Sequence, residues 1–319
     1  IALSGTISGS GTLLIPDTSG GPGSSGTLSS IVMYDASAAD VASSTLDART
    51  YGGLVEMFAD NASARTLYLS TGTYNFNAGL NVLASGAGTT SLNAAQANPT
   101  VNISGAALDF TGATGPEAIL AGTGTWSAST SVDFTGGTYT AASGNTLLLN
   151  GASQTLTTNG QTFDNLSFTS ATGATISGNA TTTGNLTLAS GMTLTGVTIT
   201  MTGSGKAIDG AGNTLPNLTI ASGASVTATS SDTTVSGTLD VSGTLSINSG
   251  RTVTPAGTLT LGGTIDGAGT LRFTDTSSGP GTGGTLSSIA RYDASTADVP
   301  AATFDARTYT ALVEAYASS

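Results

Sequence analysis

The residues most able to do chemistry in this chain are a few carboxylates and arginines that occur twice. Asp47 and Arg49 recur at a constant offset as Asp305 and Arg307. A spacing of two places both side chains of a pair on one face of a strand. Such a pair predicts either a surface ion pair worth ~0–1 kcal/mol or the cation-holding acid and basic arginine of a polysaccharide lyase. We favour the ion pair, because one pair without neighbouring acids does not make an active site.

A second recurring group consists of Asp35, Ser37 and Asp40, which return as Asp293, Ser295 and Asp298. Calcium takes six to eight oxygen ligands, commonly from several carboxylates around a turn that glycine permits. The spacing here matches neither an EF-hand nor a glycine-rich calcium-binding repeat. We therefore expect Asp35 and Asp293 to cap turns through their own side chains, with calcium as the alternative, and we predict no metal site and no cofactor.

Three further features have both a functional and an ordinary explanation. The pairs Thr193/Thr195 and Thr198/Thr200 could form the flat face of an ice-binding solenoid, but the pattern is not held regularly, so outward-facing strand threonines are favoured. Trp126 is expected to plug the core rather than to stack on a sugar. Asn-x-Ser/Thr sequons are candidates for glycosylation, although chance yields several in so Ser- and Thr-rich a chain; they begin at Asn61, Asn102, Asn165, Asn179, Asn185 and Asn217.

The composition excludes several classes of protein. With no Cys and no His, thiol nucleophiles, Ser-His triads and zinc fingers are ruled out,. Seven basic against nineteen acidic residues give a net charge of −12, which argues against nucleic acid and anionic membranes as partners,. No apolar run approaches the ~20 residues of a membrane span. The chain starts at Ile1 without a basic leader, so any signal peptide is expected to be gone already, and we expect an extracellular or cell-surface location.

Self-comparison reveals a long internal repeat. Residues 1–61 align without a gap with residues 259–319, and 37 of the 61 positions are identical. The chain is therefore predicted to hold one complete repeat unit, residues 1–258, and the start of a second copy, residues 259–319. The second copy stops within a module, because the sequence after Asn61 continues into another strand-like segment. We expect a window on a longer tandem array; a complete protein with similar caps at both ends is the alternative.

The elements that must position these residues are short strands separated by glycines. Between Val235 and Phe273, glycines recur every six or seven residues, and the segments between them alternate polar and apolar residues,. Three such segments make a coil of about 20 residues, which predicts an all-β, right-handed parallel β-solenoid (β-helix). A corner glycine such as Gly243 is expected to have a positive φ. The predicted inward residues are Leu186, Leu188, Leu194, Leu218, Ile220, Leu239, Val241, Leu245, Ile247, Leu259 and Leu261.

A resemblance appears in residues 26–58, 146–200, 202–261 and 284–316. There a strand ends in Tyr-Asp-x-Ser or a similar turn, Thr-apolar-x-x-Leu follows, one segment reads Gly-Asn-Leu-Thr-Leu, and Gly-Thr-Leu segments recur. This pattern resembles the β-strand-repeat regions of large prokaryotic cell-surface proteins, among them filamentous-haemagglutinin-like adhesins and autotransporter passengers. The resemblance implies a right-handed parallel β-solenoid, export, and an adhesive or structural role. It carries over no catalytic residue.

These observations predict an extracellular structural or adhesive β-solenoid, not an enzyme, that forms or extends a surface fibre. The expected partners are other copies of the chain, associated head to tail or laterally, and cell-surface or matrix glycans. The alternatives are a secreted β-helix lyase or hydrolase acting on polysaccharide, and an ice-binding solenoid. An enzyme should show one cluster of acids and bases in each repeat unit, whereas here the most acidic stretch is the one that recurs.

Overall fold

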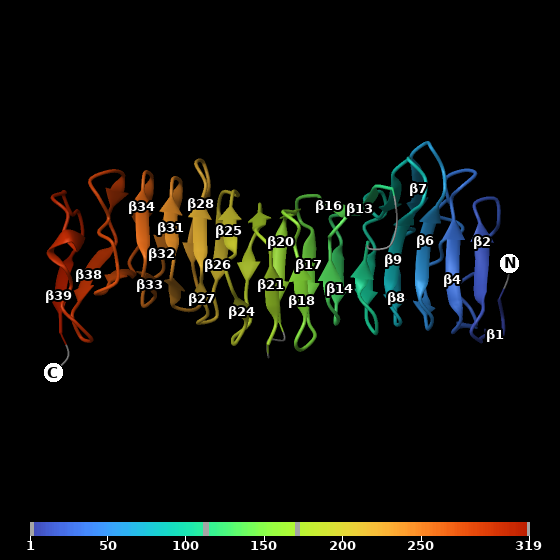
Figure 1. Cartoon of the computed structure of the whole chain (residues 1–319), viewed down its shortest axis with the longest axis horizontal. Helices are drawn as coiled ribbons and strands as arrows, with labels where there is room; N and C mark the ends of the chain where they lie inside the picture. Colours follow the sequence, from blue (N-terminus) through green and yellow to red (C-terminus); the bar gives the residue numbers. More distant parts are fainter. Residues whose placement is uncertain (1–2, 111–114, 170–172, 318–319) are drawn as a thin grey trace. The chain divides into compact units, whose positions relative to one another are not determined.

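The computed structural model describes residues 3–110, 115–169 and 173–317 and divides the chain into two compact units, Ile1–Asp164 and Asn165–Ser319. Strands make up 45% of the chain and helix 1%. Among the described residues all strand pairings are parallel, and in each unit the strands of successive coils lie side by side (Figure 1). The predicted all-β parallel β-solenoid is confirmed. The predicted boundary between residues 258 and 259 falls within the second unit and stays a prediction from the sequence.

The first unit has three faces of stacked strands. The first face holds β1 (Thr6–Ile7), β3 (Thr27–Leu28), β5 (Thr50–Tyr51), β8 (Thr73–Phe76), β11 (Thr100–Ile103), β14 (Thr125–Ala128) and β17 (Thr146–Leu149). The second holds β2 (Thr12–Pro16), β4 (Ile31–Asp35), β6 (Val55–Ala59), β9 (Leu80–Ala84), β12 (Leu108–Asp109), β15 (Val132–Asp133) and β18 (Thr155–Thr157). The third holds β7 (Arg65–Tyr68), β10 (Thr90–Asn93), β13 (Glu117–Gly122) and β16 (Gly137–Ala141), and β19 (Thr162–Phe163) follows at the end of the unit.

The second unit repeats this plan. Its first face holds β20 (Asn165–Phe168), β23 (Leu186–Thr187), β26 (Lys206–Asp209), β29 (Ser225–Ala228), β32 (Thr244–Ile247), β35 (Thr264–Asp266) and β37 (Thr285–Leu286). The second begins with β21 (Thr175–Ser177) and β24 (Thr193–Leu194), after which a new sheet holds β27 (Thr214–Leu215), β30 (Thr233–Val235), β33 (Thr252–Pro255), β36 (Thr270–Phe273), β38 (Ile289–Asp293) and β39 (Val313–Tyr316). The third holds β22 (Ala180–Thr182), β25 (Thr198–Met201), β28 (Asn217–Ile220), β31 (Thr238–Val241) and β34 (Thr258–Leu261); a 3-10 turn, η1, spans Ala301–Thr303.

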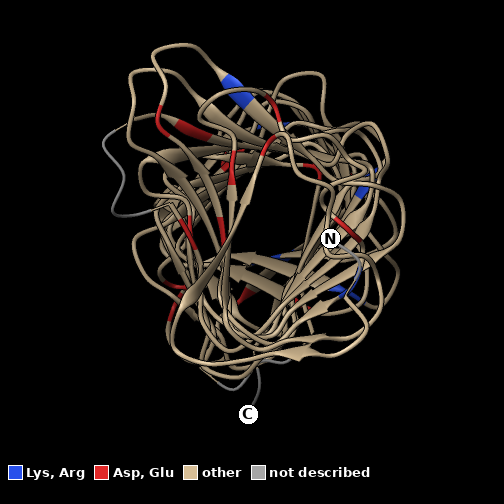
Figure 2. Cartoon of the chain, turned by 90° about the vertical axis from the view of Figure 1, so that its right-hand side faces the viewer, with Lys and Arg blue, Asp and Glu red and all other residues tan. Residues whose placement is uncertain are grey.

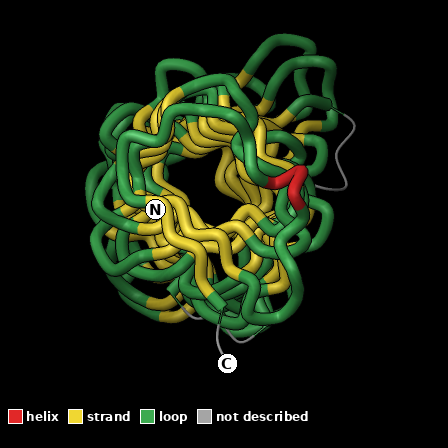
Figure 3. Tube along the Cα trace, turned by 90° about the vertical axis from the view of Figure 1, so that its left-hand side faces the viewer, coloured by secondary structure: helices red, strands yellow, loops and turns green. Residues whose placement is uncertain are grey.

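Alternating side chains decide which face of each strand is buried. In Figure 3 the strands (yellow) lie on the inner side of the coils and the loops (green) on the outer side. Ten of the eleven predicted inward residues are buried, with exposed fractions of 0–6%. Leu194 is only half-buried, because β24 is the last strand of its sheet and β27 begins another one.

Coil length differs between the units. In the second unit Leu239 pairs with Leu259, which confirms the predicted coil length. In the first unit Tyr74 pairs with Val101, so that coil is longer than the sequence pattern predicts. Aromatic side chains fill the longer coils: Tyr51 stacks on Phe76 with ring centroids 5.3 Å apart. Shorter coils hold aromatic pairs as well, since Phe273 stacks on Tyr292 of the next coil with ring centroids 5.0 Å apart, so both coil lengths meet the requirement for close packing.

The prediction of a positive φ at the corner glycine Gly243 is wrong. Its φ does not lie in the positive region, in contrast to Gly250 with φ +72°. A Cβ atom added to Gly243 would instead lie 2.5 Å from the carbonyl oxygen of Ala224 in the preceding coil. Gly263 packs in the same way against the carbonyl groups of Gly243 and Ser242. Close approach of stacked backbones, rather than backbone conformation, therefore excludes side chains at these two corners.

Candidate functional site

The pair Asp47 and Arg49 is not an ion pair. Both residues come before β5, so they do not share a strand face, and each bonds to the backbone of the loop one coil earlier. The Asp47 Oδ2 atom accepts from the Gly23 N–H at 2.6 Å, and the Arg49 Nη2 atom donates to the Gly26 carbonyl at 2.8 Å. Arg49 also donates to the Gly23 carbonyl and is only 6% exposed. The predicted surface ion pair is therefore replaced by a buried contact between consecutive coils, which we call the loop latch.

The loop latch occurs a second time, in the second repeat. Asp305 Oδ2 accepts from the Gly281 N–H at 2.6 Å, and Arg307 donates to the carbonyl groups of Gly281 at 2.9 Å and Gly284 at 3.1 Å. Charged side chains that form hydrogen bonds with the backbone of the preceding coil hold the coils in register. The sequence contained a signal for this role, since the glycines of the loop recur together with the Asp-Arg pair.

The other recurring acidic side chains also accept hydrogen bonds from backbone N–H groups. Asp35 accepts hydrogen bonds from the backbone N–H of Ser37 at 2.8 Å and from its hydroxyl group, which confirms the predicted turn cap. In the second repeat Asp293 bonds to Ser295 in the same way, and these bonds, together with nearby Arg272, lower the pKa of Asp293. Asp40 accepts from the Thr66 N–H of the next coil at 2.9 Å. Among the described residues no group of three or more acids gathers in a way that could hold a metal ion.

A buried pair of tyrosines lies beside the first loop latch. The hydroxyl groups of Tyr34 and Tyr51 are 2.8 Å apart, and Tyr51 also donates to the Asp47 carbonyl at 2.9 Å. Both rings are fully buried, and burial raises the pKa of both phenols well above 10. The equivalent Tyr292 and Tyr309 make the same contact at 2.5 Å. Tyr34 and Tyr51 therefore stay protonated, and each of the two tyrosine pairs connects two coils.

Glu117 is the one strongly perturbed carboxyl group among the described residues. It lies in β13, is 3% exposed, and accepts a hydrogen bond from the Ala84 N–H at 3.2 Å. Burial raises the pKa of Glu117 to about 7, and nearby Asp109 acts in the same direction. Local spacing offers no hint of this group, because a single Glu in a strand resembles any outward-facing residue.

The sequon asparagines form hydrogen bonds from coil to coil. Asn165 accepts from the Asn185 N–H at 2.9 Å, and Asn185 accepts from the Ala207 N–H at 2.9 Å. Asn179 and Asn217 accept in the same way from Thr198 and Thr238. The side-chain amides of Asn61 and Asn102 donate to Ser37 and Asn75. All six therefore have a structural use, and their glycosylation stays a prediction.

Trp126 and the threonine pairs have ordinary surroundings. Trp126 is fully buried and donates to the Ala121 carbonyl at 3.1 Å, which confirms the predicted core plug. Thr198 and Thr200 are followed in the stack by Asn217 and Thr219, and Asp240 follows Thr219. An unbroken Thr-x-Thr face is therefore absent from these strands.

The structure contains a polar groove that the sequence did not predict. It has a volume of about 380 Å³ and lies on the outer side of the second unit, lined by Asp232, Thr234, Thr252, Thr254, Arg272, Arg291 and Asp293. Arg272 pairs with Asp293 at 2.8 Å, and Arg291 pairs with Glu314 at 2.6 Å. The first repeat has Leu14 and Met33 at the positions of the two arginines. This difference between otherwise similar repeats is the sequence signal that could have revealed the groove.

Charge is sparse elsewhere. Figure 2 shows basic residues (blue) and acidic residues (red) as single positions between long uncharged stretches. Within the described part of the chain, no helix is long and apolar enough to cross a membrane. Comparisons with protein-family models, curated proteins and solved structures find no match to this chain, so its likeness to surface adhesins rests on the sequence motifs.

Proposed function

We propose that the chain is an extracellular structural and adhesive solenoid that forms or extends a surface fibre and catalyses no reaction. The observation that carries the proposal is the repeated loop latch. The acids and arginines best suited to chemistry bond instead to the backbone of the preceding coil, at Asp47 and Arg49 and again at Asp305 and Arg307. A chain that uses its few charges to hold coils together is built for length and mechanical persistence.

The polar groove of the second unit is the best-supported place for adhesion. Threonine hydroxyl groups, two guanidinium groups and two carboxylates line it, and these groups suit the hydroxyl-rich surface of a glycan. The groove has no counterpart of the same charge in the first repeat, where Leu14 and Met33 replace the two arginines. A feature that changes within a repeated scaffold is a better candidate for recognition than one that recurs. We therefore propose cell-surface or matrix glycans as its ligands.

Two measurements test the proposal. Antibodies against the chain should label intact, unpermeabilised cells along thin fibres; labelling only after permeabilisation would contradict an extracellular role. A glycan array should show binding by the natural chain and loss of binding by the double variant Arg272→Leu/Arg291→Met, which introduces the residues of the first repeat. Equal binding by both proteins, or binding by neither, would remove the adhesive part of the proposal.

A further inference from the structure

Two of the seven basic residues of the chain lie side by side in the polar groove. Arg272 of β36 pairs in register with Arg291 of β38, and stacked strands are ~4.8 Å apart. Two like charges this close repel each other. In the first repeat the uncharged residues Leu14 and Met33 occupy these positions, and their strands pair in the same register. The scaffold therefore forms without the arginines, and their adjacency needs another explanation.

Neutralisation of a nearby acid does not explain Arg272. Its Nε atom lies 2.8 Å from Asp293 Oδ2. The equivalent acid in the first repeat is Asp35, which caps the same kind of turn where Leu14 takes the place of the arginine. The acid is thus present with or without a guanidinium group beside it. What distinguishes the second repeat is the exposed pair of positive charges.

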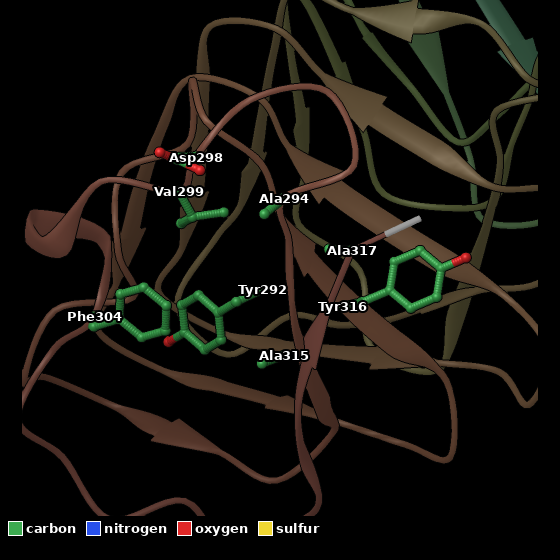
Figure 4. A pocket seen from close by; sticks show the side chains of 8 residues that line it. All are labelled: Tyr292, Ala294, Asp298, Val299, Phe304, Ala315, Tyr316 and Ala317. Carbon is green, nitrogen blue, oxygen red and sulfur yellow. The ribbon is translucent and has the colours of Figure 1, made fainter. Parts of the chain in front are cut away.

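Neighbouring side chains hold Arg291 on the outer side of its coil. Its Nε atom donates to Glu314 Oε2 at 2.6 Å, and its guanidinium carbon lies 5.5 Å from the centre of the Tyr316 ring. Figure 4 shows Tyr316 apart from the rings of Tyr292 and Phe304, which stack with centroids 4.2 Å apart. Because Tyr292 is buried, alternation along β38 places Arg291 on the opposite, outer side,.

Both guanidinium groups are fixed in a way that leaves their ends available. Each ion pair is formed through Nε, and the side chains of Arg272 and Arg291 are 38% and 35% exposed. Among the described residues, the terminal nitrogens of both groups have no hydrogen-bond partner. A guanidinium group presents its N–H donors as a planar fork, which matches the oxygens of an anionic group. This end of the groove is therefore arranged to bind an anion.

The other end of the groove offers hydroxyl groups. Thr234 of β30 and Thr252 and Thr254 of β33 line it, and Asp232 accepts from the Thr252 N–H at 2.9 Å. The strands β30, β33, β36 and β38 are consecutive in one sheet, so the groove spans three steps of ~4.8 Å, or about 14 Å, along the stack. The carboxylate of Asp232 repels a ligand that has an acid on every ring. Uncharged, hydroxyl-rich rings suit this end.

We propose that the polar groove binds a short linear glycan along the stack, with one anionic ring at the arginine end and uncharged rings at the threonine end. The proposal rests on the proposed function and names the class of glycan. The anionic group, a carboxylate or a sulfate ester, accepts hydrogen bonds from Arg272 and Arg291, and ring hydroxyl groups bind to Thr234 and Thr254. The net charge of −12 is spread over the chain and is screened beyond about 8 Å at physiological salt, so the adjacent guanidinium groups decide the local attraction.

Calorimetric titration of the full chain with matched sugars tests the charge requirement. The probes are a glucose trisaccharide, the same trisaccharide with one terminal glucuronate ring, and the same trisaccharide with one terminal sulfate ester. One of the two anionic probes should bind about tenfold more tightly than the neutral probe, the gain expected from a charge-assisted hydrogen bond. The tighter of the two identifies the anionic group. Equal binding of all three, tightest binding of the neutral probe, or binding of none would overturn the proposal.

A fourth probe tests whether the ligand has one charge or several. A trisaccharide with an anionic group on every ring should bind no more tightly than the probe with one such group, and tighter binding would overturn the single-charge assignment. A chain that binds neutral glycans on the array but shows no preference for a charged probe keeps the proposed function and loses this proposal. The two failures are therefore distinguishable.

Variants locate the contacts. Arg272→Leu and Arg291→Met introduce the residues of the first repeat, and each should weaken binding of the anionic trisaccharide about tenfold. Lys206→Met is the matched control, because it removes one positive charge from β26 on another face of the same unit; it should bind like the natural chain. Thr234→Val should weaken binding of the trisaccharide but not of the free anionic monosaccharide, which reaches only the arginine end.

The variants also give results that would contradict the proposal. Equal losses in Lys206→Met and Arg272→Leu would assign the preference to net charge instead of the groove. Unchanged preference in both arginine variants would place the ligand elsewhere. Circular dichroism should report the same fold for all variants, since the first repeat forms its coils with Leu14 and Met33 at the two arginine positions.

Discussion

Two adjacent glycines give the sharpest test of the stacked-coil geometry. A Cβ atom at Gly263 would meet the carbonyl oxygens of Gly243 and Ser242 in the preceding coil, the latter at 2.6 Å. The Gly243 carbonyl cannot move aside freely, because it accepts from the Thr264 N–H at 2.8 Å. A Cβ atom at Gly262 meets nothing within 4 Å, and its φ is not in the positive region. Gly263→Ala should therefore force two coils apart, whereas Gly262→Ala should fit.

The expected magnitudes follow from these contacts. Overpacking costs about 1–3 kcal/mol, while Gly→Ala at a compatible position stabilises by about 0.4–1 kcal/mol through the unfolded chain. The two variants should thus differ by about 3 kcal/mol in free energy of unfolding. For a unit of this size that corresponds to a difference of about 6–12 °C in Tm. Thermal melts followed by circular dichroism measure it, and equal melting temperatures for the two variants would refute the close stacking of these corners.

Three other predictions follow from the buried polar groups. Tyr51→Phe should lower the free energy of unfolding by about 1–3 kcal/mol, because the buried Tyr34 hydroxyl loses its partner,; Tyr34→Phe should cost less, because Tyr51 still donates to the Asp47 carbonyl, and denaturant melts should give this order. Arg49→Lys should destabilise more than Arg307→Lys, since Arg49 is 6% exposed and Arg307 is half-buried; the reverse order in the same melts would contradict the loop latch as a buried contact. The pKa of Glu117 is raised from 4.5 to about 7 in the folded chain, so the folded state holds this proton more tightly; its contribution to stability is present below pH ~4.5 and is lost as pH rises towards ~7. Chemical melts across that range should show the loss in the natural chain and its absence in Glu117→Gln.

Much of the fold could be predicted because it depends on local alternation. Leu239 and Leu259 face inward, as predicted from the alternation of apolar and polar residues between glycine corners. Leu194 could not be predicted, because its burial depends on the end of one sheet and the start of another. The role of Gly243 was also hidden, since the carbonyl groups that approach it belong to the preceding coil and not to its own corner.

The candidate sites were harder to predict than the fold. The spacing of Asp47 and Arg49 indicated a shared strand face, but the partners of both side chains lie in a loop of the preceding coil. The polar groove brings together Asp232, just before β30, and Arg291 of β38, although β33 and β36 lie between these strands in the sheet and only the stacking of coils joins them into one surface. Side-chain partners chosen by tertiary packing leave no trace in local spacing, although comparison of the two repeats shows where they change.

If this solenoid forms a surface fibre, the distance between its stacked strands must repeat along the fibre axis. Electron microscopy of cell-surface fibres labelled by antibodies against the chain tests this most directly. We expect label along the fibres and an axial spacing of about 4.8 Å in their averaged images, the distance between stacked parallel strands. Label confined to isolated particles or to the cell interior, or fibres without this axial spacing, would contradict the proposed role.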